Sequence, residues 1–181
     1  MPIAVIVSDV FTAKECESII EQGLQYRQEA AEAAKEYPGR VRHCQVAWFP
    51  ADDGDCAWIH QRMAEVFERV NKESWGFNLN GVSEAAQFTV YKPQDFFDWH
   101  MDVGDGDYSY RKLSSVLHLN DAGDYHGGEL QIHAEKDVRV APAAVGAVIV
   151  FPSYILHRVT PVTEGTRYSL VQWSRGKSGY R

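Results

Sequence analysis

A series of short strand-like segments in the second half of the chain constrains its fold most. Apolar or alternating runs recur there with turn residues between them, and no long helical pattern separates them. The runs are Ala86–Lys92, Phe96–His100, Leu113–Leu119, Glu129–His133, Val138–Val140, Ala147–Phe151, His157–Val162 and Arg167–Trp173. Such a series predicts a closed or double-layered β structure, and a double-stranded β-helix, also called a jelly-roll or cupin-like barrel, fits the count.

Two amphipathic helices are expected before these strands. A short first strand at Ile3–Val7 leads to Thr12-Ala13-Lys14-Glu15, which has the spacing of a helix-capping box. The helix that follows is expected to fray through an Ala/Glu-rich stretch up to Tyr37. A strand at Val41–Phe49 comes next. The second helix carries one apolar stripe, and its members are Trp58, Ile59, Met63, Val66, Phe67 and Val70.

This order of elements predicts an α+β fold. We expect a single domain over residues 1–181, with a helical support region at about 1–80 and a β-helix core at about 84–175. A chain of 181 residues can bury a sizeable core without disulfides.

Composition and charge limit the partners and the compartment. The net charge of −7 gives no basic surface for nucleic acid, so we expect no nucleic-acid partner. The apolar stretch near the N-terminus is too short for a signal peptide or a membrane span, so we expect no membrane partner. Cys16, Cys44 and Cys56 form no CxxC pair and predict free thiols in the cytoplasm.

Two histidines and an aspartate form a candidate metal site. His100 and Asp102 are two residues apart, so on a strand they share a face, and Val103-Gly104 lets the chain turn beyond them. His157 provides a second imidazole. Two imidazoles and one carboxylate leave coordination positions open, as in non-haem Fe(II) oxygenases. We therefore predict that His100, Asp102 and His157 bind iron and form the catalytic centre.

Arg167, ten residues after His157, is a candidate anion anchor. Its guanidinium can hold a distant carboxylate through two parallel hydrogen bonds, and Ser169 can add a third. We expect a hairpin with the loop Thr163-Glu164-Gly165, Gly165 in the left-handed conformation, and Val162 paired with Thr166. In this register His157, Arg167 and Ser169 all point inward.

These motifs resemble the prolyl-4-hydroxylase branch of the 2-oxoglutarate oxygenases, in particular the bacterial PKHD-type hydroxylases. The resemblance runs from about Phe88 to Trp173. It rests on His100-x-Asp102, Tyr125-His126-Gly127-Gly128-Glu129-Leu130, Phe151-Pro152-Ser153, and His157 to Val162 leading to Gly165-Thr166-Arg167-Tyr168. It adds Tyr91, on an earlier strand, as a helper of Arg167 in binding 2-oxoglutarate. The chain departs from collagen-type members at Gln94, where they carry Gly, and at Arg167, where they carry Lys.

The resemblance implies a dioxygenase that uses Fe(II), 2-oxoglutarate and O₂, with ascorbate as reductant. It would hydroxylate an unactivated C–H bond and release succinate and CO₂. A prolyl residue in a peptide or protein is the expected substrate. Two alternatives stay open: a hydroxylase of a free amino acid or small metabolite, and a non-catalytic, metal-binding, cupin-like sensing module.

Several further residues carry two interpretations. The Gly/Asp-rich loop at 103–110 is either a lid over the substrate or a plain connector. His118 lines the pocket or faces solvent, and Arg111 meets the substrate or is an exposed strand end. The remaining four histidines are expected to be structural: His43, His60, and the pair His126 and His133, which are expected to mark a hairpin around Gly127-Gly128.

Overall fold

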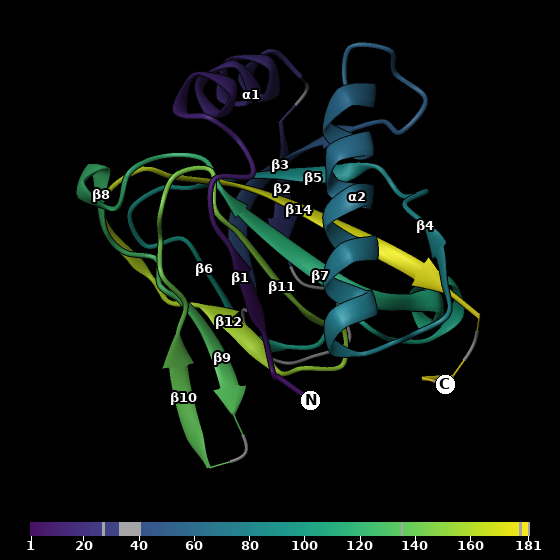
Figure 1. Cartoon of the computed structure of the whole chain (residues 1–181). Helices are drawn as coiled ribbons and strands as arrows, with labels where there is room; N and C mark the ends of the chain where they lie inside the picture. Colours follow the sequence, from purple (N-terminus) through teal and green to yellow (C-terminus); the bar gives the residue numbers. More distant parts are fainter. Residues whose placement is uncertain (27, 33–40, 135, 178, 181) are drawn as a thin grey trace.

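The computed structural model describes residues 1–26, 28–32, 41–134, 136–177 and 179–180 (Figure 1). Its helices are α1 (Ala13–Gln25) and α2 (Ala57–Ser74), with short 3₁₀ helices η1 (Gly106–Tyr110) and η2 (Ala122–Asp124). Its strands are β1 (Val5–Val7), β2 (Glu29–Glu32), β3 (Arg42–Phe49), β4 (Leu79–Gly81), β5 (Ala86–Tyr91), β6 (Phe96–His100), β7 (Arg111–His118), β8 (Tyr125–Gly127), β9 (Leu130–Ala134), β10 (Asp137–Val140), β11 (Val148–Pro152), β12 (His157–Val159), β13 (Val162–Gly165) and β14 (Arg167–Gly176).

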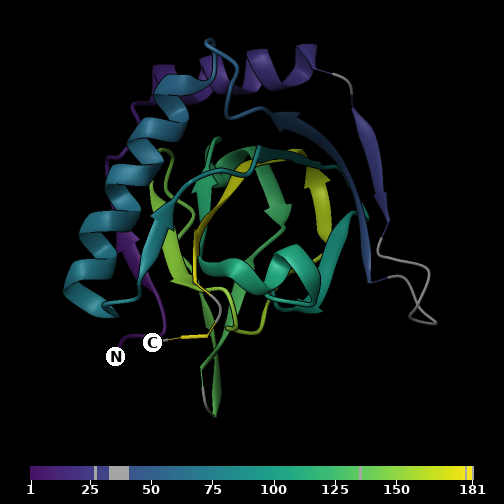
Figure 2. The same cartoon turned by 90° about the vertical axis from the view of Figure 1, so that its right-hand side faces the viewer.

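Most strands form one curled antiparallel sheet. Its order is β1-β11-β7-β14-β5-β3-β6-β12-β9-β10, with β2 added beside β3 and β4 beside β14, while β13 and β8 form a separate pair. Seen end-on in Figure 2, the strands wrap around a common interior, and α1 and α2 lie outside them. The predicted double-stranded β-helix with supporting N-terminal helices is confirmed.

The N-terminal helix begins as its capping box predicts and ends earlier than expected. The Thr12 backbone N–H donates to Glu15 Oε2 at 2.8 Å, and the Glu15 N–H donates to Thr12 Oγ1 at 3.2 Å. Helix α1 ends at Gln25, because Tyr26 is extended and its hydroxyl donates to Asp53 Oδ2. The expected continuation of the fraying helix through 29–32 is wrong, since β2 pairs there with β3. The rest of that prediction, 33–37, lies outside the described residues.

Two apolar clusters occupy the two faces of the sheet. The outer cluster packs both helices on the sheet and includes Ile19, Phe67 and Phe88. The inner cluster lies on the interior face of the barrel and includes Val116 and Phe151. Successive residues of a strand point alternately to the outer and the inner cluster. The helices cover the outer face, so the residues that can form a site are those that point inward. Neither helix of the described chain has the length and apolar character that crossing a bilayer requires.

The predicted hairpin after His157 does not form. Strand β12 pairs with β6 and β9, β13 pairs with β8, and β14 pairs with β5 and β7. Pro161 has no N–H to donate, and a Cβ at Gly127 would collide with the Pro161 carbonyl, so these backbones approach closely. Gly165 does adopt the predicted left-handed conformation, with φ 73°, and a Cβ there would collide with the Asp124 carbonyl.

The hairpin expected between His126 and His133 is also absent. Strand β8 pairs with β13, whereas β9 pairs with β10 and β12. The strands β8 and β9 follow one another in the chain but do not pair with each other. This is the arrangement of a double-stranded β-helix rather than of a meander.

Gln94 provides a stability test, because it has a φ of 76° in the turn between β5 and β6. A left-handed non-glycine residue costs about 1–2 kcal/mol, part of which the greater chain entropy of glycine offsets. We expect Gln94→Gly to raise the free energy of unfolding in urea by about 0.5–1 kcal/mol. Gln94→Ala keeps the left-handed strain and should leave the free energy of unfolding nearly unchanged. A destabilised Gln94→Gly protein would contradict this explanation.

Candidate metal and co-substrate site

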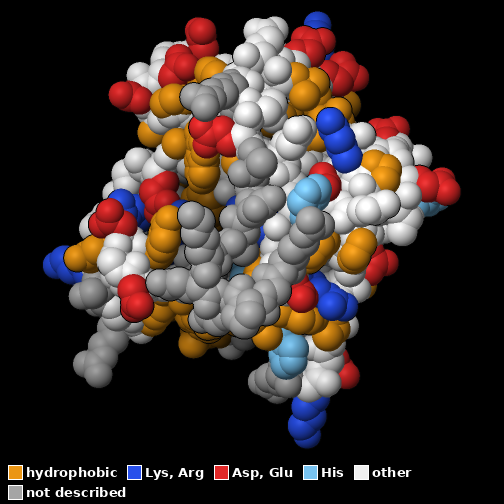
Figure 3. Space-filling view, turned by 180° about the vertical axis from the view of Figure 1, so that it is seen from behind, with side chains coloured by type: hydrophobic (Ala, Val, Ile, Leu, Met, Phe, Trp, Pro, Cys, Tyr) orange, Lys and Arg blue, Asp and Glu red, His pale blue; other side chains and the backbone are white. Residues whose placement is uncertain are grey.

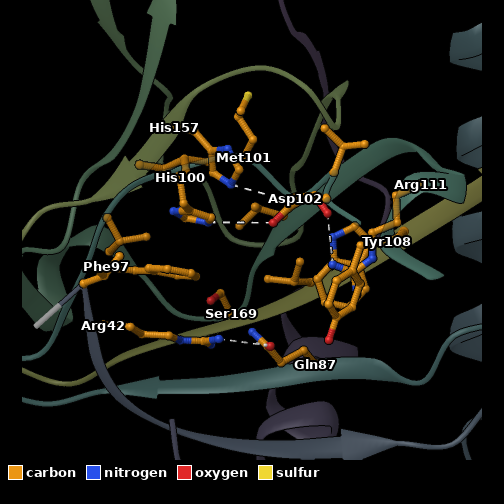
Figure 4. A pocket seen from close by; sticks show the side chains of 18 of the residues that line it. Arg42, Gln87, Phe97, His100, Met101, Asp102, Tyr108, Arg111, His157 and Ser169 are labelled. Carbon is orange, nitrogen blue, oxygen red and sulfur yellow. Dashed lines mark hydrogen bonds and ion pairs between the residues drawn. The ribbon is translucent and has the colours of Figure 1, made fainter. Parts of the chain in front are cut away.

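The three predicted metal ligands meet at one end of the barrel interior. His157, the first residue of β12, is the register partner of His100, the last residue of β6. Asp102 lies beyond the end of β6, and its N–H donates to the Ser153 carbonyl at 2.9 Å, as does that of Val103 at 3.1 Å. One ligand atom from each of His100, Asp102 and His157 lies within 4.8 Å of the others (Figure 4).

The geometry of these side chains suits a shared cation. His100 Nε2 lies 3.7 Å from Asp102 Oδ1, and His157 Nε2 lies 3.6 Å from Asp102 Oδ2. Both distances exceed a hydrogen bond. The Nδ1 atoms face backbone carbonyls: His100 Nδ1 lies 2.7 Å from Asp98 O, and His157 Nδ1 lies 2.9 Å from Ile155 O. Donation from Nδ1–H leaves each Nε2 lone pair free for a metal.

Electrostatics favour the protonation states that a metal needs. Burial and, second, the nearby His157 lower the pKa of His100 to about 3, so the imidazole is neutral. Burial alone raises the pKa of Asp102. His157 and His100, with smaller contributions from the Ser114 hydroxyl and Arg111, outweigh burial and lower it. Asp102 Oδ2 is a buried acceptor without a hydrogen-bond partner in the described chain, and a cation fits it.

The predicted anion anchor lies on the same interior face. Arg167 is fully buried, and its Nη1 donates to Ser169 Oγ at 3.0 Å. Its Nε and Nη2 atoms have no partner among the described residues. Tyr91 is the register partner of Arg167, and the guanidinium carbon lies 5.3 Å from the Tyr91 ring centroid. Burial raises the pKa of Tyr91, so its phenol stays protonated and can donate.

One cavity joins these groups. Its volume is about 570 Å³, within the usual range for small-molecule sites, and its walls include His100, Asp102, His157, Arg167 and Ser169. The site therefore combines neutral nitrogen ligands and a carboxylate, which suit Fe(II), with a buried and incompletely paired guanidinium, which suits a carboxylate. Iron(II) and a dicarboxylate both fit the residues present.

His118 is buried, so its solvent-facing interpretation is wrong. It pairs across strands with Ser169, and neither ring nitrogen has a hydrogen-bond partner in the described part of the chain. Burial, followed by the charge of Arg167, lowers the pKa of His118 to about 3. The imidazole is therefore neutral beside the guanidinium.

The buried imidazole predicts acid sensitivity. The unfolded chain protonates His118 near pH 6.5, whereas the folded protein does so only near pH 3. The neutral His118 therefore contributes fully to stability above about pH 6.5, and this contribution is lost as the pH falls from about 6.5 towards 3. The unfolding free energy of the wild type should fall between pH 7 and 5. In His118→Phe we expect this fall to be smaller by about 2 kcal/mol. The exposed His126→Phe is the control, and an unchanged slope in His118→Phe would contradict the assignment.

Arg111 is also buried, so the exposed strand-end interpretation is wrong. Its Nε donates to both carboxylate oxygens of Glu84, at 3.1 and 3.0 Å, and its Nη1 donates to the Asp102 carbonyl at 3.3 Å. Tyr108, from the 103–110 loop, stacks on this guanidinium and lines the cavity. Whether the loop acts as a lid stays a prediction.

Sequence reasoning missed one wall of the cavity. Arg42, Gln87 and Phe97 line it; in Figure 4, Arg42 and Gln87 lie across the cavity from the metal ligands, and Phe97 stacks on His100. Alternation along β3 places Arg42 on the face of Cys44 and Val46, which was a usable signal. The pairing of β3 with β6 could not be read from spacing.

Residues 86–175 match the model of the 2OG-Fe(II) oxygenase superfamily. The chain belongs to this superfamily. It is 39% identical over 82 residues to a PKHD-type hydroxylase of Synechococcus sp. (strain CC9902), covering 44% of this chain and 36% of that protein. It is 32% identical over 110 residues to one of Idiomarina loihiensis, covering 60% and 50%. These alignments therefore span between about a third and a half of the relatives' length.

Solved structures support the fold of this 2OG-Fe(II) oxygenase over nearly the whole chain. A Pseudomonas putida prolyl-4-hydroxylase has a TM-score of 0.72 at 22% identity, over 97% of this chain and 94% of that one. A prolyl hydroxylase from Trichoplax adhaerens, solved with a peptide fragment of hypoxia inducible factor, has a TM-score of 0.75 at 16% identity, over 97% and 84%. The superfamily implies Fe(II) as the metal cofactor and 2-oxoglutarate and O₂ as co-substrates.

Proposed function

We propose that this chain is an Fe(II)- and 2-oxoglutarate-dependent dioxygenase that hydroxylates a prolyl residue in a peptide or protein. In the overall reaction, one atom of O₂ enters the hydroxyl group of the product and the other enters succinate, with release of CO₂. The observation that carries the proposal is the placement of two free Nε2 atoms and a buried carboxylate in one cavity with the incompletely paired guanidinium of Arg167.

Each residue has a distinct part in the proposed reaction. His100, Asp102 and His157 hold the metal and leave the remaining coordination positions to the reactants. When bound, iron supplies the O₂ activation and C–H oxidation that side chains cannot perform. Arg167, Ser169 and Tyr91 hold the far carboxylate of 2-oxoglutarate and so fix its other end toward the metal. Apolar neighbours such as Val116 and Val159 keep this part of the cavity dry.

The proposed peptide substrate rests on similarity to prolyl hydroxylases, one of which was solved with a peptide. We propose no nucleic-acid partner, in keeping with the face shown in Figure 3, where the described Lys and Arg side chains are scattered rather than gathered. Ascorbate as reductant, the absence of a membrane partner and the cytoplasmic location stay predictions from sequence.

A turnover assay tests the proposal. The protein is incubated with Fe(II), 2-oxoglutarate, O₂ and ascorbate, and succinate is measured by NMR. Mass spectrometry of proline-containing peptides then looks for the mass of one added oxygen atom. We expect metal-dependent succinate and hydroxylated peptide. Absence of succinate with every peptide and amino acid offered would favour the non-catalytic sensing module instead.

A second candidate, hydroxylation of a free amino acid or another small metabolite, is favoured by one observation. The cavity contains Arg42 in addition to Arg167. A second cation near the reaction centre is a feature that a small carboxylate substrate can use.

A further inference from the structure

Arg42 presents an incompletely paired guanidinium at the cavity wall. Its Nε donates to Cys44 Sγ at 3.1 Å, and its Nη1 makes a long 3.4 Å hydrogen bond to Gln87 Oε1. Its Nη2 is buried and has no partner among the described residues. The guanidinium carbon lies 4.5 Å from the ring centroid of Phe97. The side chain is half-buried, and no described carboxylate pairs with it, although a charge that is partly removed from water is costly unless it is paired.

The other charges of the cavity have counterions in the proposed complex. Arg111 pairs with Glu84 through two nitrogen atoms. The two positive charges of the metal and the one of Arg167 are balanced by the carboxylate of Asp102 and the two carboxylates of 2-oxoglutarate. The charge of Arg42 therefore remains unbalanced, and it matches one further negative charge in the cavity.

Arg42 is also separated from the 2-oxoglutarate anchor. Its partner Gln87 is the register partner of Val171, four residues along β14 from Arg167. Four residues of strand correspond to about 13 Å. In Figure 4, Arg42 and Gln87 lie across the cavity from His100, Asp102 and His157, with Phe97 between Arg42 and His100. The two arginines thus have different partners in the cavity: Arg42 contacts Gln87, and Arg167 contacts Ser169.

We propose that Arg42, helped by Gln87, binds a carboxylate of the substrate and so selects substrates that carry one near the reacting C–H bond. This inference rests on the proposed function, because it specifies which substrates the proposed hydroxylase would select. The Gln87 side-chain nitrogen already donates to Thr89 Oγ1 at 3.0 Å, so the amide is held in place with its oxygen toward Arg42. The carboxylate comes either from a free amino acid or from an acidic residue of a peptide.

Binding without turnover tests this selection. The protein is loaded with Mn(II) and 2-oxoglutarate in the absence of O₂, and the relaxation of probe protons by bound Mn(II) gives each dissociation constant. Two matched pairs are compared: L-proline with L-prolinamide, and acetyl-Asp-Pro-amide with acetyl-Asn-Pro-amide. We expect the carboxylate member of one pair to bind about 10- to 100-fold more tightly, as a charge-assisted hydrogen bond allows. The pair that shows the preference identifies the source of the carboxylate.

Variants assign the preference to its residue. Arg42→Gln should abolish it, Arg42→Lys should keep part of it, and the affinity for 2-oxoglutarate should stay within about twofold. Arg139→Gln, which removes the same charge from the exposed strand β10, should keep the preference. Equal or undetectable binding within both pairs, a preference that persists in Arg42→Gln, or a loss of 2-oxoglutarate affinity in its place would each overturn the inference. Failure of the proposed function appears separately, as absence of succinate from the Fe(II) protein.

Discussion

Replacing Asp102 with asparagine is expected to lower the affinity for divalent metal by at least about 100-fold and to abolish succinate formation. Loss of an outer-shell partner alone costs about 10- to 100-fold in metal affinity, and Asp102 supplies the only carboxylate of the described triad. The amide is neutral and nearly the same size as the carboxylate, so the fold should persist. Metal affinity is measured by titration of the apo protein with Mn(II), followed by electron paramagnetic resonance.

The control for Asp102→Asn is the unfolding of the metal-free protein. The lowered pKa of Asp102 means that its charge contributes some stability, while one of its oxygens has no hydrogen-bond partner in the described chain. Thermal unfolding of apo Asp102→Asn should therefore stay cooperative and occur only slightly below that of the wild type. Metal binding at wild-type strength in this variant would show that the cation is held elsewhere.

Replacing Arg167 with methionine is expected to weaken binding of 2-oxoglutarate by about 100-fold or more. Breaking a buried ion pair by removing one partner costs about 3–5 kcal/mol, because the remaining charge stays buried and unpaired. Ser169→Ala removes one hydrogen bond to a charged group and should cost less, about 1.5–3 kcal/mol. Arg167→Lys keeps the charge without the two parallel hydrogen bonds and should fall between these limits. Isothermal titration of the Mn(II) protein with 2-oxoglutarate measures all three.

The same variant has an opposite effect on the empty protein. In the absence of 2-oxoglutarate, the fully buried Arg167 retains two nitrogen atoms with no partner among the described residues. A methionine there removes a buried charge, so the unfolding temperature of apo Arg167→Met should rise. A variant that is less stable and binds 2-oxoglutarate as the wild type does would show that Arg167 is a structural residue.

The sequence contained enough to predict the elements and the ligand residues, because both depend on local chemistry. The Thr12 capping box, the apolar stripe of α2 and the alternating runs from β5 to β14 each reflect a few neighbouring residues. His100 and Asp102 lie two residues apart in the chain, so strand alternation and the turn after them were enough to predict that they meet. Family resemblance then connected them with His157 and Arg167.

Strand pairing could not be predicted in the same way. The turn at Gly165 suggested a local hairpin, yet β13 pairs with β8, whose close approach depends on Gly127, nearly forty residues earlier. Arg167 and Ser169 face the interior because β14 pairs with β5 and β7, which is a different reason from the predicted one. The wall formed by Arg42 and Phe97 depends on another distant pairing, between β3 and β6. Such choices are set by packing across the whole barrel and leave no local signal.

A crystal structure of the protein with Mn(II) and 2-oxoglutarate, prepared without O₂, tests the central claim most directly. We predict one metal ion at about 2.0–2.2 Å from His100 Nε2, His157 Nε2 and an Asp102 carboxylate oxygen, and the far carboxylate of 2-oxoglutarate on Arg167. A metal ion bound away from these three residues, or a co-substrate carboxylate that does not contact Arg167, would contradict the account.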